Sequence, residues 1–208
     1  MHTRILTEKQ KPVLELLSQL EIVNDFYLAG GTALALQYGH RKSVDFDFFR
    51  ELPFAVDSVL DGLKRVTEIE VRVREENTLL VLIKGISCSF FKYQYPLLRE
   101  SLYFRQNVKM ASTADIAAMK ISAISTRGTK RDFIDLFFIC NREYPLLEIL
   151  RFYQEKFAQL NHELYHVYKS LTYFGDAEED AMPAMFEKID WKKIKLFFEN
   201  EIKQFMKT

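Results

Sequence analysis

The stretch FYLAGGTALALQYGHRKSVDFDFF, residues 26–49, decides the fold class of this chain. Its apolar residues 26–29 run into Gly30 and Gly31, which predicts a buried strand that enters a tight turn. Strong helix formers occupy Thr32–Tyr38, and we expect Thr32 to be the N-cap of that helix. The order strand, Gly-Gly turn and helix is typical of an α/β unit.

The end of the same stretch alternates apolar and acidic residues. We expect a strand over residues 44–49 in which Val44, Phe46 and Phe48 face the core. Asp45 and Asp47 would then project together from the opposite face. The sequence therefore places an acidic strand face shortly after the glycine turn.

These two features suit phosphate and metal chemistry when they occur together. A glycine pair lets the backbone approach a phosphate, and the helix that follows points its N–H groups at the anion. Two carboxylates on one strand face are hard oxygen ligands suited to Mg²⁺ or Mn²⁺. Taken singly, a Gly-Gly is more often an ordinary turn and an Asp-x-Asp is more often a solvent-exposed strand edge. Their order along the chain favours the functional interpretation.

The remaining pattern divides the chain near residue 110. We expect a mixed α/β domain over residues 1–110, with a capping box at Thr7–Gln10, a first helix to about Val23, and a hairpin turn at Lys84-Gly85. Residues 111–208 have helical periodicity almost throughout. The predicted helices of that half cover residues 113–126, 130–140, 145–159, 161–172 and 190–206.

Composition limits the classes of function that are open to the chain. Its 208 residues are 48% hydrophobic, enough for a substantial core. Lysine plus arginine equals aspartate plus glutamate at 29 each, so it lacks the basic surplus of a non-specific nucleic-acid binder. Its two cysteines imply neither a disulfide framework nor a zinc ribbon. With no signal-peptide pattern and no membrane-length apolar run, we expect a cytoplasmic protein without a membrane partner.

Several motifs resemble one known family. The blocks are GGTALAL (residues 30–36), GHR (39–41), SVDFD (43–47), DIAAMK (115–120) and RGTKRDFIDL (127–136), with weaker likeness in YFGDAE (173–178). They resemble the AbiEii/AbiGii toxin family, whose members are nucleotidyltransferases of the DNA polymerase β-like superfamily. The resemblance spans about residues 26 to 200. It implies an α+β fold, in which a mixed sheet with flanking helices is followed by a helical half that completes the active-site cleft.

The resemblance also assigns roles to individual residues. It implies that Gly30, Gly31 and Thr32 cradle the triphosphate of an NTP, and that Asp45 and Asp47 bind Mg²⁺ or Mn²⁺. Lys120 would reach the phosphates as a point charge, and Asp132 would orient Lys120 or a substrate group. Arg41 and Arg131 are further expected nucleotide contacts, and Asp135 is expected to be more structural. The family implies a toxin of a toxin–antitoxin or phage-defence system, with RNA such as tRNA as acceptor and a cognate antitoxin as partner.

One position departs from the wider superfamily. Many polymerase β-like transferases carry a third carboxylate on a later strand, where it completes the metal site and helps to deprotonate the attacking hydroxyl. The candidate strand here, residues 86–91, offers Ser89 at the position expected for that acid. A neutral serine supplies neither charge nor a general base. A non-catalytic nucleotide-binding module on the same fold is therefore the main alternative.

A second motif supports a more remote alternative. His162, Glu163 and His166 match the H-E-x-x-H pattern of zinc hydrolases, in which two histidines bind zinc and the glutamate activates water. However, Leu164, Val167 and Leu171 form the apolar stripe of the predicted helix, which places both histidines on its solvent side. The pattern therefore favours an exposed helix face.

Overall fold

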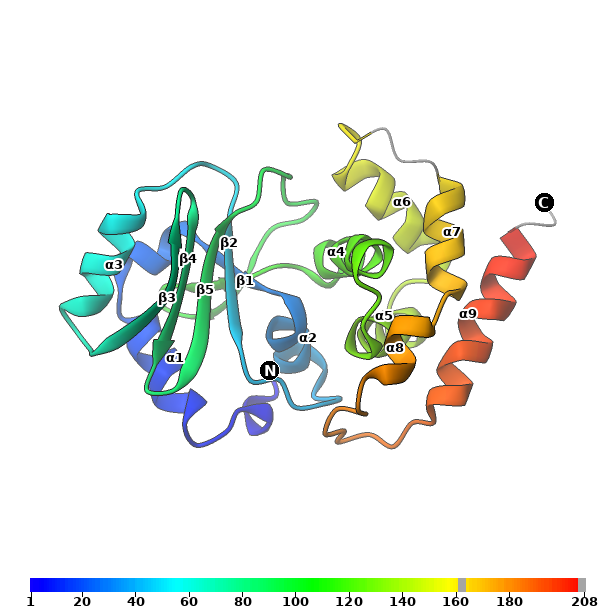
Figure 1. Cartoon of the computed structure of the whole chain (residues 1–208), viewed down its shortest axis with the longest axis horizontal. Coiled ribbons are helices and arrows are strands. Elements are labelled where there is room, and N and C mark those ends of the chain that lie inside the picture. Colours follow the sequence, from blue (N-terminus) through cyan, green and yellow to red (C-terminus); the bar gives the residue numbers. More distant parts are fainter. Residues whose placement is uncertain (161–163, 206–208) are drawn as a thin grey trace. The chain divides into compact units, whose positions relative to one another are not determined.

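The computed structural model describes residues 1–160 and 164–205. By contacts, the chain forms two compact units, Met1–Ser112 and Thr113–Thr208. The boundary predicted after residue 110 lies close to this division. The first unit contains the sheet, and the second is helical (Figure 1).

The first unit is built on a seven-stranded mixed sheet in the order β3-β4-β5-β2-β1-β7-β6. Strands β1 and β7 are parallel, as are β2 and β5, whereas the other neighbours are antiparallel. The strands are β1 (Tyr27–Ala29), β2 (Phe46–Arg50), β3 (Ile69–Glu75), β4 (Thr78–Ile83), β5 (Ile86–Lys92), β6 (Leu102–Arg105) and β7 (Val108–Met110).

The helices of this unit are η1 (Thr3–Ile5), α1 (Gln10–Ser18), η2 (Glu21–Asp25), α2 (Gly30–Tyr38) and α3 (Val56–Lys64). The predicted capping box is present. The backbone N–H of Gln10 donates to the Thr7 hydroxyl, and the backbone N–H of Thr7 donates to Oε1 of Gln10. The prediction of one helix to about Val23 is wrong: α1 ends at Ser18 and a 3-10 turn, η2, follows.

Alternation along the strands gives the sheet one fully buried face and one partly buried face. The buried face lies on the side of α1 and α3 (Figure 1) and carries side chains with 0–1% exposure: Leu28, Phe46, Phe48, Leu79, Val81, Ile83, Cys88 and Phe90. The positions between them belong to the other face, on which Asp47 is partly exposed whereas Ser89 and Tyr27 are buried. The predicted hairpin turn is present, with positive φ at both Lys84 and Gly85, as a tight hairpin requires.

The second unit consists of α4 (Thr113–Thr126), α5 (Lys130–Arg142), α6 (Leu146–Lys156), α7 (Leu164–Thr172), α8 (Gly175–Glu179) and α9 (Trp191–Phe205). Helix α4 packs against α5, α6 and α7, and α9 packs against α5 and α7. The Phe133 ring on α5 contacts Phe174, Trp191 and Phe198, which join α5, α9 and the segment before α8. Across the described part of the chain, no helix has the length and apolar character needed to span a membrane.

Candidate active site

Gly30 brings the start of α2 against an aspartate of β2. Its φ of +68° lies in the left-handed region, which glycine adopts without strain. A Cβ built at this position would lie 3.4 Å from Oδ2 of Asp47. The neighbouring strand register pairs Ala29 with Asp47. The turn and the Asp47 carboxylate are therefore in direct proximity, as a combined phosphate and metal site requires.

Gly31 makes room for a buried guanidinium. Arg41 is only 2% exposed, and its Nη1 donates to the carbonyl of Lys42 at 2.9 Å. A side chain at Gly31 would collide with Nη2 of Arg41. The structure thus holds the positive charge of Arg41 against the glycine turn, in a position that suits the nucleotide contact expected from the sequence.

The role predicted for Thr32 as N-cap is wrong. Helix α2 begins at Gly30 with Ala29 as its N-cap, so Thr32 lies in the first turn. Its hydroxyl is 2.5 Å from the carbonyl oxygen of Asp45 and 2.8 Å from Oγ of Ser43. Because the side chain is 2% exposed, this hydroxyl fixes the chain that precedes β2. Its predicted contact with a triphosphate stays a prediction.

The strand that carries the aspartates is shorter than the sequence suggests. It begins at Phe46, so Asp45 precedes it, and Val44 is 50% exposed, contrary to the core position predicted for it. The reason is that β1 and β5 pair with residues from Phe46 or later. Both carboxylates are partly accessible, and Asp45 is placed by the contact of its carbonyl with Thr32 rather than by strand pairing.

Cys88 on β5 lies within electrostatic range of both carboxylates. Burial raises the pKa of its thiol far above the ordinary value, and the negative charges of Asp47 and Asp45 raise it further. The thiol is therefore neutral at neutral pH and does not act as a nucleophile. Asp47 pairs in register with Ser89 on β5, which places this serine beside the carboxylate on the same sheet face.

A second set of predicted residues meets in the helical unit. Nζ of Lys120 on α4 lies 2.8 Å from Oδ1 of Asp132 and 2.7 Å from Oδ2 of Asp135, both on α5. The Lys120 side chain is 6% exposed and the two aspartates are at most 1% exposed. Asp132 and Asp135 are therefore buried and do not form a solvated helix face. The spacing of three residues puts both carboxylates on one side of α5, facing α4.

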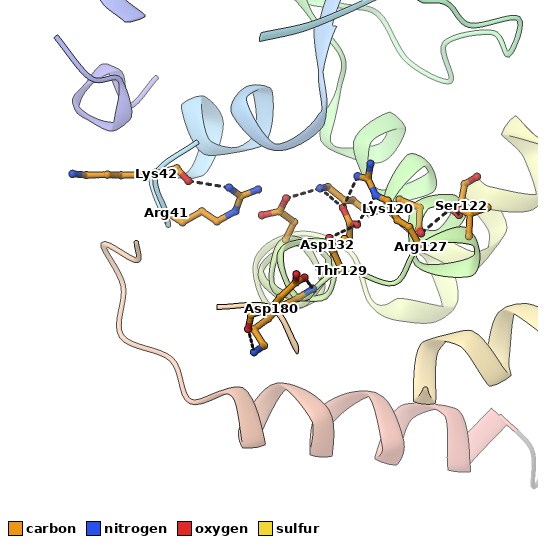
Figure 2. Close-up of polar contacts among 12 residues, drawn as sticks. Arg41, Lys42, Lys120, Ser122, Arg127, Thr129, Asp132 and Asp180 are labelled. Carbon is orange, nitrogen blue, oxygen red and sulfur yellow. Dashed lines mark hydrogen bonds and ion pairs between the residues drawn. The ribbon is translucent and has the colours of Figure 1, made fainter. Parts of the chain in front are cut away.

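Two residues without a predicted role complete this cluster. Arg127 donates from Nε to Oδ2 of Asp132 at 3.0 Å, and the Thr129 hydroxyl donates to the same oxygen at 2.6 Å (Figure 2). Burial by itself would raise the pKa of the Asp132 carboxyl, but the charges and hydrogen bonds of Lys120 and Arg127 hold it well below its ordinary value. Asp132 is thus charged at neutral pH, and its carboxylate positions Lys120. The Thr-x-x-Asp spacing at a helix start was the available sequence signal.

Arg131, in contrast, is exposed on α5. Its contact with nucleotide stays a prediction. Of the zinc-hydrolase motif, His162 and Glu163 lie outside the described residues, and Nε2 of His166 is 3.4 Å from the carbonyl oxygen of Ser125.

Comparison with known proteins decides the family. The description "Nucleotidyl transferase AbiEii toxin, Type IV TA system" belongs to a family model that matches residues 13–99 and 92–206. The chain belongs to this family. An AbiEii protein is a nucleotidyltransferase, which confirms the enzyme class expected from residues 30–47 and 115–136. Family membership therefore favours nucleotidyl transfer over zinc hydrolysis.

One curated relative has a similar length. An uncharacterized protein of Aquifex aeolicus is 37% identical over 211 residues, which cover 99% of this chain and 100% of the relative.

Solved structures with low sequence identity show the same fold. MenT4, a nucleotidyltransferase toxin of Mycobacterium tuberculosis, matches with a TM-score of 0.60 at 15% identity, covering 92% of this AbiEii chain and 82% of its own. A nucleotidyltransferase structure from Helicobacter pylori matches with a TM-score of 0.57 at 17% identity, covering 95% of both chains. The predicted fold, a mixed sheet with flanking helices followed by a helical half, is confirmed.

Proposed function

We propose that this AbiEii protein transfers a nucleoside monophosphate from an NTP to an RNA acceptor, in a reaction that depends on Mg²⁺ or Mn²⁺ bound by Asp45 and Asp47. The observation that carries the proposal is the proximity of Gly30 to Asp47, with Asp45 fixed next to them by the Thr32 hydroxyl. A phosphate-approaching turn and an acidic pair lie together in one unit.

The donor set fits a magnesium ion. Mg²⁺ is commonly bound by one or two carboxylates, and it takes water and substrate phosphate oxygens as its other ligands. Among residues 1–160 and 164–205, no cluster of three or more His, Cys, Asp or Glu side chains is placed to hold a metal. We expect Asp45 and Asp47 to supply two of the ligands, and the nucleotide and water to supply the others. Such an ion would neutralise phosphate charge and polarise the phosphoryl group.

The residues of the chain can then be given roles in the transfer. A hydroxyl of the acceptor attacks the α-phosphorus, a new O–P bond forms, and the bond to the β-phosphate oxygen breaks, so that pyrophosphate leaves with the electron pair. The Gly30–Gly31 backbone and Arg41 would hold the phosphates, and Lys120, fixed by Asp132 and Asp135, would contribute a directed positive charge.

Ser89 has a consequence for the fate of the hydroxyl proton. It stands beside Asp47 at the position expected for a third carboxylate, and a serine does not accept a proton at neutral pH. The attacking hydroxyl must therefore lose its proton to water or to Asp47. We expect the rate to rise with pH more steeply than in an enzyme with a dedicated carboxylate base.

The test is a transfer assay with purified protein, Mg²⁺, labelled NTPs and cellular RNA. Wild type should label RNA, and Asp45→Asn and Asp47→Asn should each lower the rate by about 100-fold or more. Asp61→Asn, an exposed aspartate of α3, is the matched control and should behave as wild type. Absence of any transfer that depends on Asp45 and Asp47, together with NTP binding by calorimetry, would instead support the non-catalytic nucleotide-binding module.

The family description supports a biological context for the reaction. We infer that the protein acts in the cytoplasm as the toxin of a type IV toxin–antitoxin system, with a cognate antitoxin as partner. Expression of the wild type should stop cell growth, and Asp47→Asn should relieve this effect. A neighbouring gene that restores growth when co-expressed would identify the antitoxin, and harmless expression of an active enzyme would argue against the toxin role.

A further inference from the structure

The loop that joins α2 to β2, residues 39–45, carries Arg41 and Asp45 of the proposed site. Residues 42–45 belong to no helix or strand, and β2 begins only at Phe46. The ladder hydrogen bonds of the sheet therefore do not fix Asp45. Its position depends on side chains that reach the loop from other elements.

Gln10, in the first turn of α1, is one such side chain. It is 0% exposed, and its Nε2 donates to the carbonyl oxygen of Ser43 at 2.9 Å. Its Oε1 accepts from the backbone N–H and from the hydroxyl of Thr7, each at 3.0 Å. Because a backbone N–H only donates and a carbonyl only accepts, these partners fix the orientation of the amide group. Gln10 thus joins the start of α1 to a loop that lies 33 residues later in the chain.

Ser43 connects this contact to Asp45. The Thr32 hydroxyl is 2.8 Å from Oγ of Ser43 and 2.5 Å from the carbonyl oxygen of Asp45. A Cβ built on Gly31 would lie 3.2 Å from Oγ of Ser43, so this part of the loop lies against the glycine turn. Gln10 therefore holds the backbone before Asp45 at one end, and Thr32 holds it at the other.

The N-terminal segment also contacts the opposite end of the loop. The backbone N–H of His2 donates to the carbonyl of Leu36, in the last turn of α2, at 2.7 Å. A Cβ built on Gly39 would lie 2.7 Å from Cγ and Nδ1 of the His2 ring. Residues 2–10 thus border the loop at both of its ends, and Gln10 supplies the side-chain hydrogen bond closest in sequence to Asp45.

We propose that Gln10 is a positioning residue for metal binding, which keeps Asp45 in place by holding the carbonyl of Ser43. This inference rests on the proposed metal-dependent transfer for its purpose, but restraint of the loop requires neither metal nor NTP. A glutamate would serve equally well in an ordinary capping box, because both side chains accept the N–H of the first capping-box residue. The glutamine amide alone can also donate to the carbonyl of Ser43, since an ionised carboxylate has no hydrogen to donate.

The first test measures restraint of the loop by amide hydrogen exchange, in EDTA and without NTP. Gln10→Glu keeps the acceptor for Thr7 and loses the donor to Ser43, whereas Gln10→Met loses both without burying a charge. Each should speed exchange of the loop amides about fivefold or more, because a loop released from a contact opens more often. The matched control is Ser18→Ala, which removes the hydrogen bond from a buried hydroxyl to the carbonyl of Glu15 on the same helix. It should leave exchange of the loop unchanged.

The second test measures Mn²⁺ binding by electron paramagnetic resonance, again without NTP. Both Gln10 variants should raise the Kd for Mn²⁺ about fivefold or more, since residues that orient a metal ligand strongly affect metal affinity. In the transfer assay, their KM for Mn²⁺ should rise and saturating Mn²⁺ should restore most of the rate. A purely structural role of Gln10 would lower the thermal midpoint and leave the metal affinity of the folded protein unchanged.

Several results would overturn the proposal. Equal exchange of the loop in wild type and in both Gln10 variants would do so, as would faster exchange with an unchanged Kd for Mn²⁺. The same changes in Ser18→Ala would assign the effect to a general loss of stability in α1. Mn²⁺ binding that does not depend on Asp45 and Asp47 would refute the proposed metal site, and the exchange measurement would still decide whether Gln10 holds the loop.

Discussion

Substitution Lys120→Met tests the buried charge cluster of the helical unit most directly. It removes the cation that lies 2.8 Å from an oxygen of Asp132 and 2.7 Å from an oxygen of Asp135. Those two oxygens are then at most about 5.5 Å apart, and at an effective dielectric constant of about 20 their repulsion is about 3 kcal/mol. Removing one member of a buried ion pair typically costs about 3–5 kcal/mol. Both estimates predict that the substitution lowers the free energy of unfolding of the helical unit by at least about 3 kcal/mol.

The assay follows from the position of the single tryptophan. Trp191 lies at the start of α9 and its ring contacts Phe133 on α5, so its fluorescence reports unfolding of the helical unit. For a unit of about 100 residues, a loss of 3 kcal/mol lowers the thermal midpoint by about 12 °C or more. Lys193→Met, an exposed lysine of α9, is the matched control and should change the free energy of unfolding by less than about 0.5 kcal/mol.

A double substitution separates repulsion from lost attraction. In Lys120→Met combined with Asp135→Asn, Asp132 is the one carboxylate of the pair that stays charged. It keeps the hydrogen bonds from Arg127 and Thr129. The double variant should therefore regain at least half of the stability that Lys120→Met loses. A cost of less than about 1 kcal/mol for Lys120→Met would refute the reasoning, because pairs of that strength are screened by water.

Three further predictions concern other buried or strained positions. Lys156→Met should destabilise the helical unit by about 3–5 kcal/mol in urea unfolding, because Lys156 and Asp115 form an ion pair at 2.8 Å with both side chains fully buried; an unchanged midpoint would contradict this. Gly30→Ala should cost about 1–2 kcal/mol, because φ is +68°, and should weaken NTP binding in calorimetry, because the new Cβ would occupy the space beside Asp47; tighter NTP binding would count against the site. Because the folded pKa of Asp132 is below its ordinary value of 3.8, its contribution to stability is complete above that pH and is lost as pH falls through the lowered value. Asp132→Asn should therefore weaken the pH dependence of the unfolding free energy of the helical unit below about pH 4, and a profile unchanged from wild type would contradict the assignment.

Local patterns in the sequence predict part of the fold and miss elements that depend on distant pairing. The strands near Leu28 and Phe48 and the Lys84-Gly85 turn follow from alternation and from turn residues, which act over a few neighbours. Strands β6 and β7 were not predicted, because both are short. In addition, β7 is positioned by its pairing with β1, about 80 residues earlier in the chain. Val44 continues the alternation but lies outside the pairing, so it is exposed.

Only some residues of the candidate site could likewise be predicted from the sequence. Gly30, Asp45 and Asp47 could be chosen from one continuous stretch, since a turn and a strand face are both local features. Thr129 also had a local signal, the Thr-x-x-Asp spacing at the start of α5. Arg127 could not be chosen, because its contact with Asp132 depends on how the loop between α4 and α5 folds back on the α5 N-terminus. Ser89 was identified by its strand position, and the register beside Asp47 agrees with that choice.

The Lys120 cluster has a consequence for how fast a nucleotide is captured. Lys120 and Arg127 carry two positive charges and Asp132 and Asp135 carry two negative ones, so their charges cancel when seen from a distance. The electrostatic field of a group of charges whose sum is zero falls off faster with distance than that of a single charge. Such a group does little to steer an anion through solution. If these residues meet the triphosphate, the on-rate for NTP should depend only weakly on ionic strength, and the cluster should act through the lifetime of the bound complex.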